Sequence, residues 1–137
     1  MSKDPLYVLT ALECIEKISI YSKGFDSGEA LFQANDQLNY NAVIKLISVI
    51  GEEISKIGSK LLVNHEIDWQ AIKGTRNRIV HDYRGLDRDI IYSIIETELP
   101  KLKEALIEIY EGFEMPADLT KVLFKSPHYA HVKYLFR

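Results

Sequence analysis

The sequence has one cysteine and no long apolar run, and both shortages limit where the protein can work. Cys14 has no second cysteine with which to form an internal disulfide, so a reducing cytoplasm is the simplest location. No apolar run approaches the roughly 18 residues of a membrane-spanning helix. Residues 1–5 lack the apolar core of a signal peptide. We therefore expect a soluble cytoplasmic protein that does not enter a membrane.

Positive charge is also in short supply. Lys and Arg number 17 against 20 Asp and Glu, which gives a net charge of −3. This balance excludes a protein that coats nucleic acid by bulk electrostatics. Between Lys73 and Arg88, however, five basic residues accompany two acidic ones, for a local charge of +3. A basic segment in an acidic chain indicates one small anion-binding site, although a solvated charged surface is the ordinary alternative.

Strand patterns are absent too. No segment alternates apolar and polar residues with period two, and no turn pair typical of a β-hairpin occurs. Apolar residues instead recur at helical spacing, and a length of 137 residues suits one domain. We predict an all-α, up-and-down helical bundle over residues 1–116. Long helices are expected at residues 4–24, 36–62, 68–85 and 87–112, and a short helix is expected just after Ser27. Asp4, Asp68 and Asp87 are the expected N-terminal caps.

Glycine and proline are few, and three of them have positional meaning. Gly51 and Gly58 fall seven residues apart inside the long predicted helix, where each costs about 1 kcal/mol. That cost is tolerable where another helix approaches closely, within the chain or across a dimer. Pro100 lies inside the last predicted helix and is expected to kink it or split it in two.

Residues 117–137 differ in composition and are predicted to form a C-terminal extension. Four basic residues stand against one acid, Asp118, with aromatic residues between them. The basic residues are Lys121, Lys125, Lys133 and Arg137, and the aromatic ones include Phe124, Tyr129, Tyr134 and Phe136. Such a mixture either binds single-stranded nucleic acid or packs on the bundle or on a partner subunit. His128 and His131 are spaced for a shared metal ion, but a third ligand is not evident, so no metal site is predicted.

The octapeptide Arg76-Asn77-Arg78-Ile79-Val80-His81-Asp82-Tyr83 combines a permanent cation, an imidazole and a phenol. Arg76 can neutralise a phosphate in a bidentate fork, and His81 can accept and donate a proton near neutral pH. Asn77 can position the phosphate or the imidazole through its amide. These groups suffice to cut a phosphodiester without a metal. The candidates to bind the rest of the substrate are Lys73, Arg78 and Arg84.

The orientation of these residues on one helix poses a problem. Neighbouring residues are about 100° apart around a helix axis, so Arg76 and Tyr83 project from nearly the same face while His81 lies about 140° from Arg76. Three arrangements would unite Arg76 with His81: a bent arginine side chain, a helix that ends or distorts near His81, or a site shared by two subunits. A structural alternative also stands, in which Arg76 pairs with Glu52 or Glu53 and Tyr83 fills the core.

The pattern R-x4-H-x-Y within this octapeptide resembles the signature of the HepT-like HEPN toxins. Residues 50–53 resemble the I-G-E-A turn of that family's long second helix, and residues 68–77 resemble its W-x-x-I-x-G-x-R-N segment. Residues 86–87 and 99–102 resemble the segment that follows. The resemblance covers about residues 6–110 and does not extend to the C-terminal extension.

This resemblance implies a two-fold HEPN dimer and a ribonuclease toxin of a type II toxin–antitoxin system. His81 would remove the proton of an RNA 2′-hydroxyl, the alkoxide would attack the adjacent phosphorus, and Arg76 would stabilise the charge on the phosphate oxygens. The activity would need no metal and no cofactor. The resemblance also implies a minimal nucleotidyltransferase antitoxin, which transfers AMP from ATP to Tyr83 and so neutralises the toxin.

Two other functions compete with that of an endoribonuclease. One is a non-catalytic HEPN protein that binds nucleotide or RNA as the partner of a nucleotidyltransferase, and the other is a plain dimeric scaffold. The octapeptide favours the endoribonuclease and the binding protein over the scaffold, because a scaffold does not need an arginine, a histidine and a tyrosine at this spacing. His81 separates those two, since only catalysis needs its proton chemistry.

Overall fold

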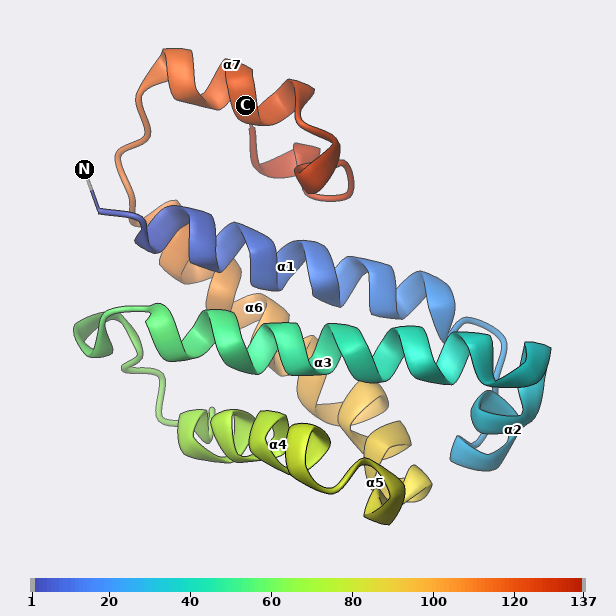
Figure 1. Ribbon diagram of the computed structural model, residues 1–137. Helices are drawn as coiled ribbons and strands as arrows, with labels where there is room; N and C mark the ends of the chain where they lie inside the picture. The colour runs from blue at the N-terminus through green and yellow to red at the C-terminus, as the bar shows by residue number, and fades with distance from the viewer. Residues whose placement is uncertain (1, 137) are drawn as a thin grey trace.

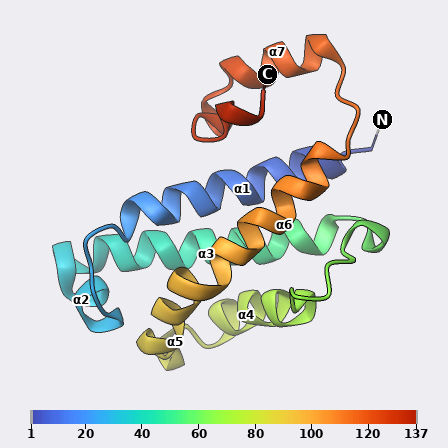
Figure 2. The same cartoon turned by 180° about the vertical axis from the view of Figure 1, so that it is seen from behind.

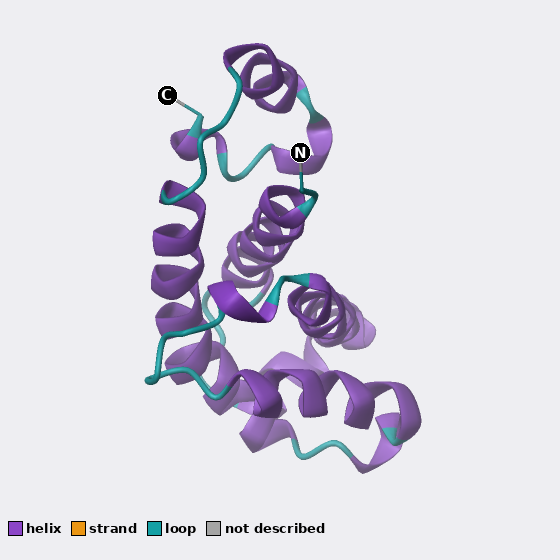
Figure 3. Cartoon of the chain, turned by 90° about the vertical axis from the view of Figure 1, so that its left-hand side faces the viewer, coloured by secondary structure: helices purple, strands orange, loops and turns teal. Residues whose placement is uncertain are grey.

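The computed structural model describes residues 2–136, in which every regular element is a helix (Figure 1). The main helices are α1 (Asp4–Tyr21), α2 (Gly28–Gln33), α3 (Leu38–Lys56), α4 (Trp69–His81), α5 (Arg88–Ser93), α6 (Leu99–Glu111) and α7 (Ala117–Lys125). Short 3-10 turns lie at Ala34–Gln37, Ser59–Leu61, Tyr83–Gly85, Pro127–Tyr129 and Lys133–Leu135, and a π-helical stretch lies at Ile94–Glu98. The predicted all-α class is confirmed (Figure 3), while dimerisation stays a prediction. No helix within residues 2–136 has both the length and the apolar character needed to cross a membrane.

The core lies between α1, α3 and α6. α1 and α3 run antiparallel side by side, and α6 crosses behind both of them (Figures 1 and 2). Apolar side chains make this contact, because a period of 3.6 residues gathers them on one side of each helix. The fully buried ones include Leu9, Leu12 and Ile18 of α1, Val43, Ile50 and Ile54 of α3, and Leu106 of α6. Cys14 packs among them, and burial raises the pKa of its thiol to about 11, so it is an inert packing residue.

α4 covers the opposite side of α3 and is only shallowly embedded. Of its 13 residues Ile79 alone is buried, and Trp69 and Ile72 are half-buried against the core. Its packing partner within the described residues is chiefly α3. A wide polar face of α4 is therefore open to solvent in the single chain.

Helix starts agree with the sequence at two of the three predicted caps. The carboxylates of Asp68 and Asp87 accept N–H hydrogen bonds from the first turns of α4 and α5, at 2.8–3.2 Å. The prediction for Asp4 is wrong, because Lys3 occupies the cap position of α1. Asp4 Oδ1 instead accepts the N–H of Gly58 at 3.1 Å, which ties the start of α1 to the loop after α3.

α3 is shorter than predicted at both ends. It begins only at Leu38, because residues 35–37 adopt left-handed backbone angles (φ 52°, 57° and 67°) that interrupt a right-handed helix. It ends at Lys56, so Gly58 lies outside the helix, and the expected pair of glycines on one helix face is wrong. The apolar pattern continues past the end of the helix. Ile57 lies in the loop after α3, and its side chain is buried against the core.

Pro100 does not split the last long helix. α5, the π-helical stretch and α6 follow one another without a break from Arg88 to Glu111. Proline removes one N–H from the helical hydrogen-bond ladder, and a wider π-turn is one way in which a helix accommodates such an irregularity. The distortion expected at Pro100 thus takes the form of a π-helical stretch just before it.

The C-terminal extension packs on the bundle. Leu123 of α7, and Val132 and Phe136 beyond it, are buried against the core. Glu13 of α1, only 3% exposed, accepts the backbone N–H of His131 at 2.7 Å and lies 2.6 Å from its Nδ1. Packing is therefore confirmed as the role of these extension residues. The division of the chain at residue 116 stays a prediction.

Candidate active site on α4

The approach of α4 to α3 depends on Gly51. A Cβ atom at Gly51 would lie 2.5 Å from the Cβ of Arg76 and 3.1 Å from the carbonyl oxygen of Ile72. Only a residue without a side chain lets the two helices lie this close. The close helix contact predicted at Gly51 is confirmed, and it forms within the chain. The backbone of Arg76 is thereby held against the C-terminal half of α3.

Gly51→Ala is expected to lower the free energy of unfolding by about 1–3 kcal/mol, because the added methyl group forces α4 away from α3. Thermal unfolding followed by circular dichroism measures the change. Gly74→Ala, on α4 itself, is the matched control, since a Cβ there meets no atom within 4 Å. That variant should be as stable as the wild type or up to about 1 kcal/mol more stable. Equal stabilities for the two variants would contradict the close approach at Gly51.

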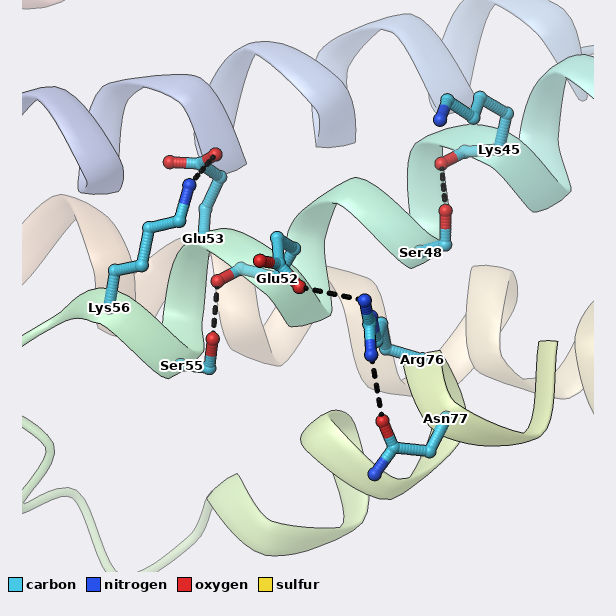
Figure 4. A network of polar contacts seen from close by, with 8 residues as sticks. All are labelled: Lys45, Ser48, Glu52, Glu53, Ser55, Lys56, Arg76 and Asn77. Carbon is cyan, nitrogen blue, oxygen red and sulfur yellow. Dashed lines mark hydrogen bonds and ion pairs between the residues drawn. The ribbon is translucent and has the colours of Figure 1, made fainter. Parts of the chain in front are cut away.

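Arg76 is held by polar groups on both sides (Figure 4). Its Nη2 lies 3.1 Å from Glu52 Oε2 of α3, and its Nη1 donates to Asn77 Oδ1 at 3.1 Å. The predicted alternative of an ion pair with Glu52 is therefore confirmed, whereas Glu53 pairs with Lys56. The side chains of Arg76 and Glu52 are 35% and 45% exposed, and an exposed pair of this kind contributes roughly 0–1 kcal/mol. The guanidinium is oriented, yet it remains accessible to an anion from solvent.

His81 is the last residue of α4 and is exposed. It follows Arg76 by five positions and so points about 140° away from the side of the helix that packs on α3. The helix ends directly after His81, but His81 itself keeps helical geometry, so this ending does not redirect its ring toward Arg76. Within one chain, Arg76 and His81 therefore face different sides of α4.

Tyr83 lies in the 3-10 turn after α4, and its hydroxyl donates a hydrogen bond to Asn41 Oδ1 of α3. The expectation that Tyr83 shares a helix face with Arg76 is wrong, because the chain leaves the helix at Asp82 (φ −144°, ψ 53°). Tyr83 does not fill the core either, since it is 45% exposed. Nothing in the sequence singled out Asn41, which is one polar residue among many near the start of α3.

The two contacts on α3 separate Tyr83 from Arg76. Asn41 and Glu52 are 11 residues apart in α3, which corresponds to about 16 Å along the helix axis. The hydroxyl of Tyr83 and the guanidinium of Arg76 are thus anchored at different points of the same helix. An AMP group on Tyr83 would therefore not place its phosphate directly beside the Arg76 of the same chain.

The other basic residues of the segment divide into two groups. Arg78 and Arg84 are exposed, and Lys73 is half-buried. Arg78 precedes His81 by three positions, so Arg78 and His81 lie on the same side of α4. Arg88 instead pairs with Glu29 of α2 at 2.7 Å. It joins α5 to α2 and is not part of the open basic surface.

Metal ligands do not gather in the described part of the chain. Residues 2–136 contain no group of three or more His, Cys, Asp or Glu side chains arranged to hold a metal ion. His131, one member of the histidine pair considered from the sequence, is engaged with Glu13.

Comparison with known proteins places the chain among ribonuclease-like sequences. The family model described as Ribonuclease HepT-like matches residues 11–109. A protein of Methanocaldococcus jannaschii named "Gamma-glutamylcyclotransferase and putative RNase" is 33% identical over 83% of this chain, which spans about half (51%) of that longer relative. A second protein of that organism, named "Putative RNase", is 27% identical over 72% of this chain and 88% of its own length.

A further relative comes from Thermococcus cleftensis. It is named "Probable ribonuclease HepT" and is 26% identical over 71% of this chain and 86% of its own length. No solved structure matches the chain. The family match covers α4 and the whole octapeptide with its arginine, histidine and tyrosine. The chain therefore belongs to the HepT-like ribonuclease family.

Proposed function

We propose that this protein is the toxin of a type II toxin–antitoxin system and a metal-independent endoribonuclease. The observation that carries the proposal is the second half of α4, where Arg76, Asn77 and His81 lie within six residues and each side chain is at least partly open to solvent. Arg76 is oriented by Glu52 and Asn77 and is open to solvent, as a phosphate-binding group must be. The ribonuclease names of the relatives agree with this use of the surface.

The proposed reaction is a transesterification within RNA. His81 accepts the proton of a 2′-hydroxyl, and the new alkoxide oxygen bonds to the adjacent phosphorus. The bond from phosphorus to the 5′-oxygen breaks, and that oxygen takes up a proton. Arg76 binds the non-bridging oxygens and stabilises the negative charge that develops on them. The products are a 2′,3′-cyclic phosphate end and a 5′-hydroxyl end.

A dimer would complete the site. Arg76 and His81 face different sides of α4 in one chain, so a second chain related by a two-fold axis could supply the missing group to each site. Three elements each carry an exposed apolar residue: Leu38 at the start of α3, Val80 on α4 and Ile90 on α5. Burial of such residues favours association of two copies at this end of the bundle. Each completed site then holds one His81 as its base, and a water molecule protonates the leaving 5′-oxygen.

The nature of the cut ends tests the proposed reaction. Purified protein is expected to cleave RNA in the presence of excess EDTA and to leave 2′,3′-cyclic phosphate and 5′-hydroxyl ends. Mass spectrometry of the fragments identifies both ends. An otherwise identical substrate with a 2′-deoxyribose at the cleaved position should resist cleavage, because the nucleophile is missing. Cleavage that stops in EDTA, or that persists on the deoxy substrate, would contradict the mechanism.

The second candidate function is a non-catalytic, RNA- or nucleotide-binding partner of a nucleotidyltransferase. The ion pair between Arg76 and Glu52 favours it, because a carboxylate already occupies one edge of the guanidinium. In both functions a nucleotidyltransferase partner modifies Tyr83 with AMP, for which the exposed side chain offers access. RNA that binds but stays intact in the EDTA assay would favour this second function.

A further inference from the structure

A hollow of about 480 Å³ lies between α7 and the end of the chain, outside the region matched by the family model. Its lining includes Lys121, Phe124 and Lys125 of α7, and Phe136. The first three stand at positions i, i+3 and i+4, so they project from one side of the helix. We call Lys121, Phe124, Lys125 and Lys133 the α7 patch.

Lys133 belongs to this patch through its contact with Phe124. Its ammonium nitrogen lies 4.9 Å from the centroid of the Phe124 ring, which is a cation–π contact. Phe124 is nevertheless 46% exposed, unlike Phe136, which is 7% exposed. An aromatic ring that packing has left open is able to stack on another planar group.

The charge of the α7 patch is not neutralised within the described residues. The ammonium groups of Lys121, Lys125 and Lys133 take part in no ion pair among residues 2–136, whereas Lys17, Lys56 and Lys103 each pair with a glutamate. Among the described residues, the lining of the hollow contains no acidic side chain. The patch is therefore complementary to an anion, although the chain as a whole carries a net charge of −3.

We propose that the α7 patch is a binding site for single-stranded RNA, separate from the cleavage site. An unpaired base stacks on the exposed face of Phe124, and the three ammonium groups contact the phosphates on either side. A duplex fits less well, because its bases are already stacked and paired. The choice of RNA as the ligand rests on the ribonuclease function proposed above.

The position of the patch gives it a distinct role. α7 lies on the α1 side of the molecule and α4 on the far side of α3, so the two surfaces are separated by the α1–α3 layer (Figures 1 and 3). An RNA held at the patch is retained at a second point, away from the octapeptide. Variants of the patch should therefore weaken RNA binding without changing the chemistry at His81.

Binding of a non-cleavable RNA to the full chain tests the proposal. The probe is a fluorescent 2′-O-methyl oligouridine of about ten nucleotides, a length within the range of single-strand binding sites. It lacks the attacking hydroxyl, so its binding does not depend on whether the protein cleaves RNA. Fluorescence anisotropy gives the dissociation constant. Phe124→Ala is expected to raise it about tenfold, which corresponds to the loss of one stacked base.

Two further variants complete the experiment. The double variant Lys121→Ala, Lys125→Ala should also bind about tenfold more weakly, and its affinity should depend less on salt. Lys23→Ala, an exposed lysine at the opposite end of α1, is the matched control and should bind like the wild type. The Phe124 and lysine variants must keep the wild-type melting temperature, as expected for exposed positions.

Each outcome decides the proposal. Affinities of the patch variants equal to that of Lys23→Ala would overturn it, and so would a duplex of the same sequence that binds as tightly as the single strand. Loss of self-association in Phe124→Ala, with unchanged RNA binding, would assign the patch to a second copy of the chain instead. If the chain binds the probe as expected but never cleaves RNA, the patch stands and the endoribonuclease function fails.

Discussion

Replacing His81 with alanine is expected to reduce RNA cleavage at least about a hundredfold and leave the fold intact. General acid–base catalysis contributes typically about 10²–10⁴ to a rate, and His81 is the one imidazole of the octapeptide. It is exposed at the end of α4, so its removal should change the free energy of unfolding by less than about 0.5 kcal/mol. Initial cleavage rates in EDTA, together with thermal melting, measure both effects. Undiminished cleavage by the folded variant would exclude His81 as the base.

Arg76→Ala provides the complementary half of this test. It should be as inactive as His81→Ala, and Arg76→Lys should be impaired, because an ammonium group cannot replace a bidentate fork. The orientation of Arg76 and His81 on different sides of α4 leads to a sharper expectation. If each site combines Arg76 of one chain with His81 of another, co-expression of the two inactive variants yields mixed dimers with one complete site. About a quarter of the wild-type activity should then return.

This mixing experiment separates a shared site from a site within one chain. Sedimentation of the mixture confirms that dimers are present, and differently sized tags on the two variants show that the dimers are mixed. Mixed dimers without activity would mean that Arg76 and His81 of the same chain act together, through a bent arginine side chain. A wild-type protein that sediments as a monomer and still cleaves RNA would also refute the shared site.

Much of the fold follows from local patterns that the sequence displays openly. The helices of the core could be predicted because their apolar residues recur at helical spacing. The starts of α4 and α5 could be predicted because Asp68 and Asp87 are N-terminal caps. The ends of α3 could not be predicted from the same signal. Ile57 is buried after the helix has ended, so its apolar character reports burial and not helical geometry. The left-handed residues before Leu38 include no glycine. Asn35 and Asp36 tolerate such angles better than most residues, but both are also common in helices and at helix starts, so the signal is weak.

The candidate site was predictable in its residues but not in its arrangement. Arg76, His81 and Tyr83 stand out because their side chains carry the chemistry. Their positions relative to one another depend on two features. Gly51 allows Arg76 to pack closely against α3, and the chain leaves the helix at Asp82. The second of these has no strong sequence signal, because Asp82 is followed by two residues that helices tolerate. Helical spacing alone therefore predicts the wrong face for Tyr83.

The turn that carries Tyr83 changes how its modification would inhibit the toxin. Tyr83 follows His81 by two positions, so their Cα atoms are no more than about 7 Å apart. A phosphodiester on the Tyr83 hydroxyl adds a negative charge and the volume of an adenosine near His81, in the segment that would receive RNA. Substrate phosphates would be repelled and access to His81 narrowed, without unfolding.

Tyr83→Phe is expected to remain toxic in the presence of the nucleotidyltransferase, whereas the wild type is neutralised. Intact-mass and peptide mass spectrometry after co-expression should find one or more AMP groups on the wild-type peptide that contains Tyr83, and none on the variant. Tyr83→Phe also removes the hydrogen bond to Asn41, so Asn41→Ala is the matched control. It removes the same bond, worth about 0.5–1.5 kcal/mol, but keeps the hydroxyl that accepts AMP. Asn41→Ala should therefore be modified and neutralised. AMP transfer to Tyr83 should be faster than in the wild type, because the tyrosine hydroxyl no longer has to break a hydrogen bond to Asn41. If the partner neutralises Tyr83→Phe as completely as Asn41→Ala, binding alone is the antidote, and modification of Tyr83 is not.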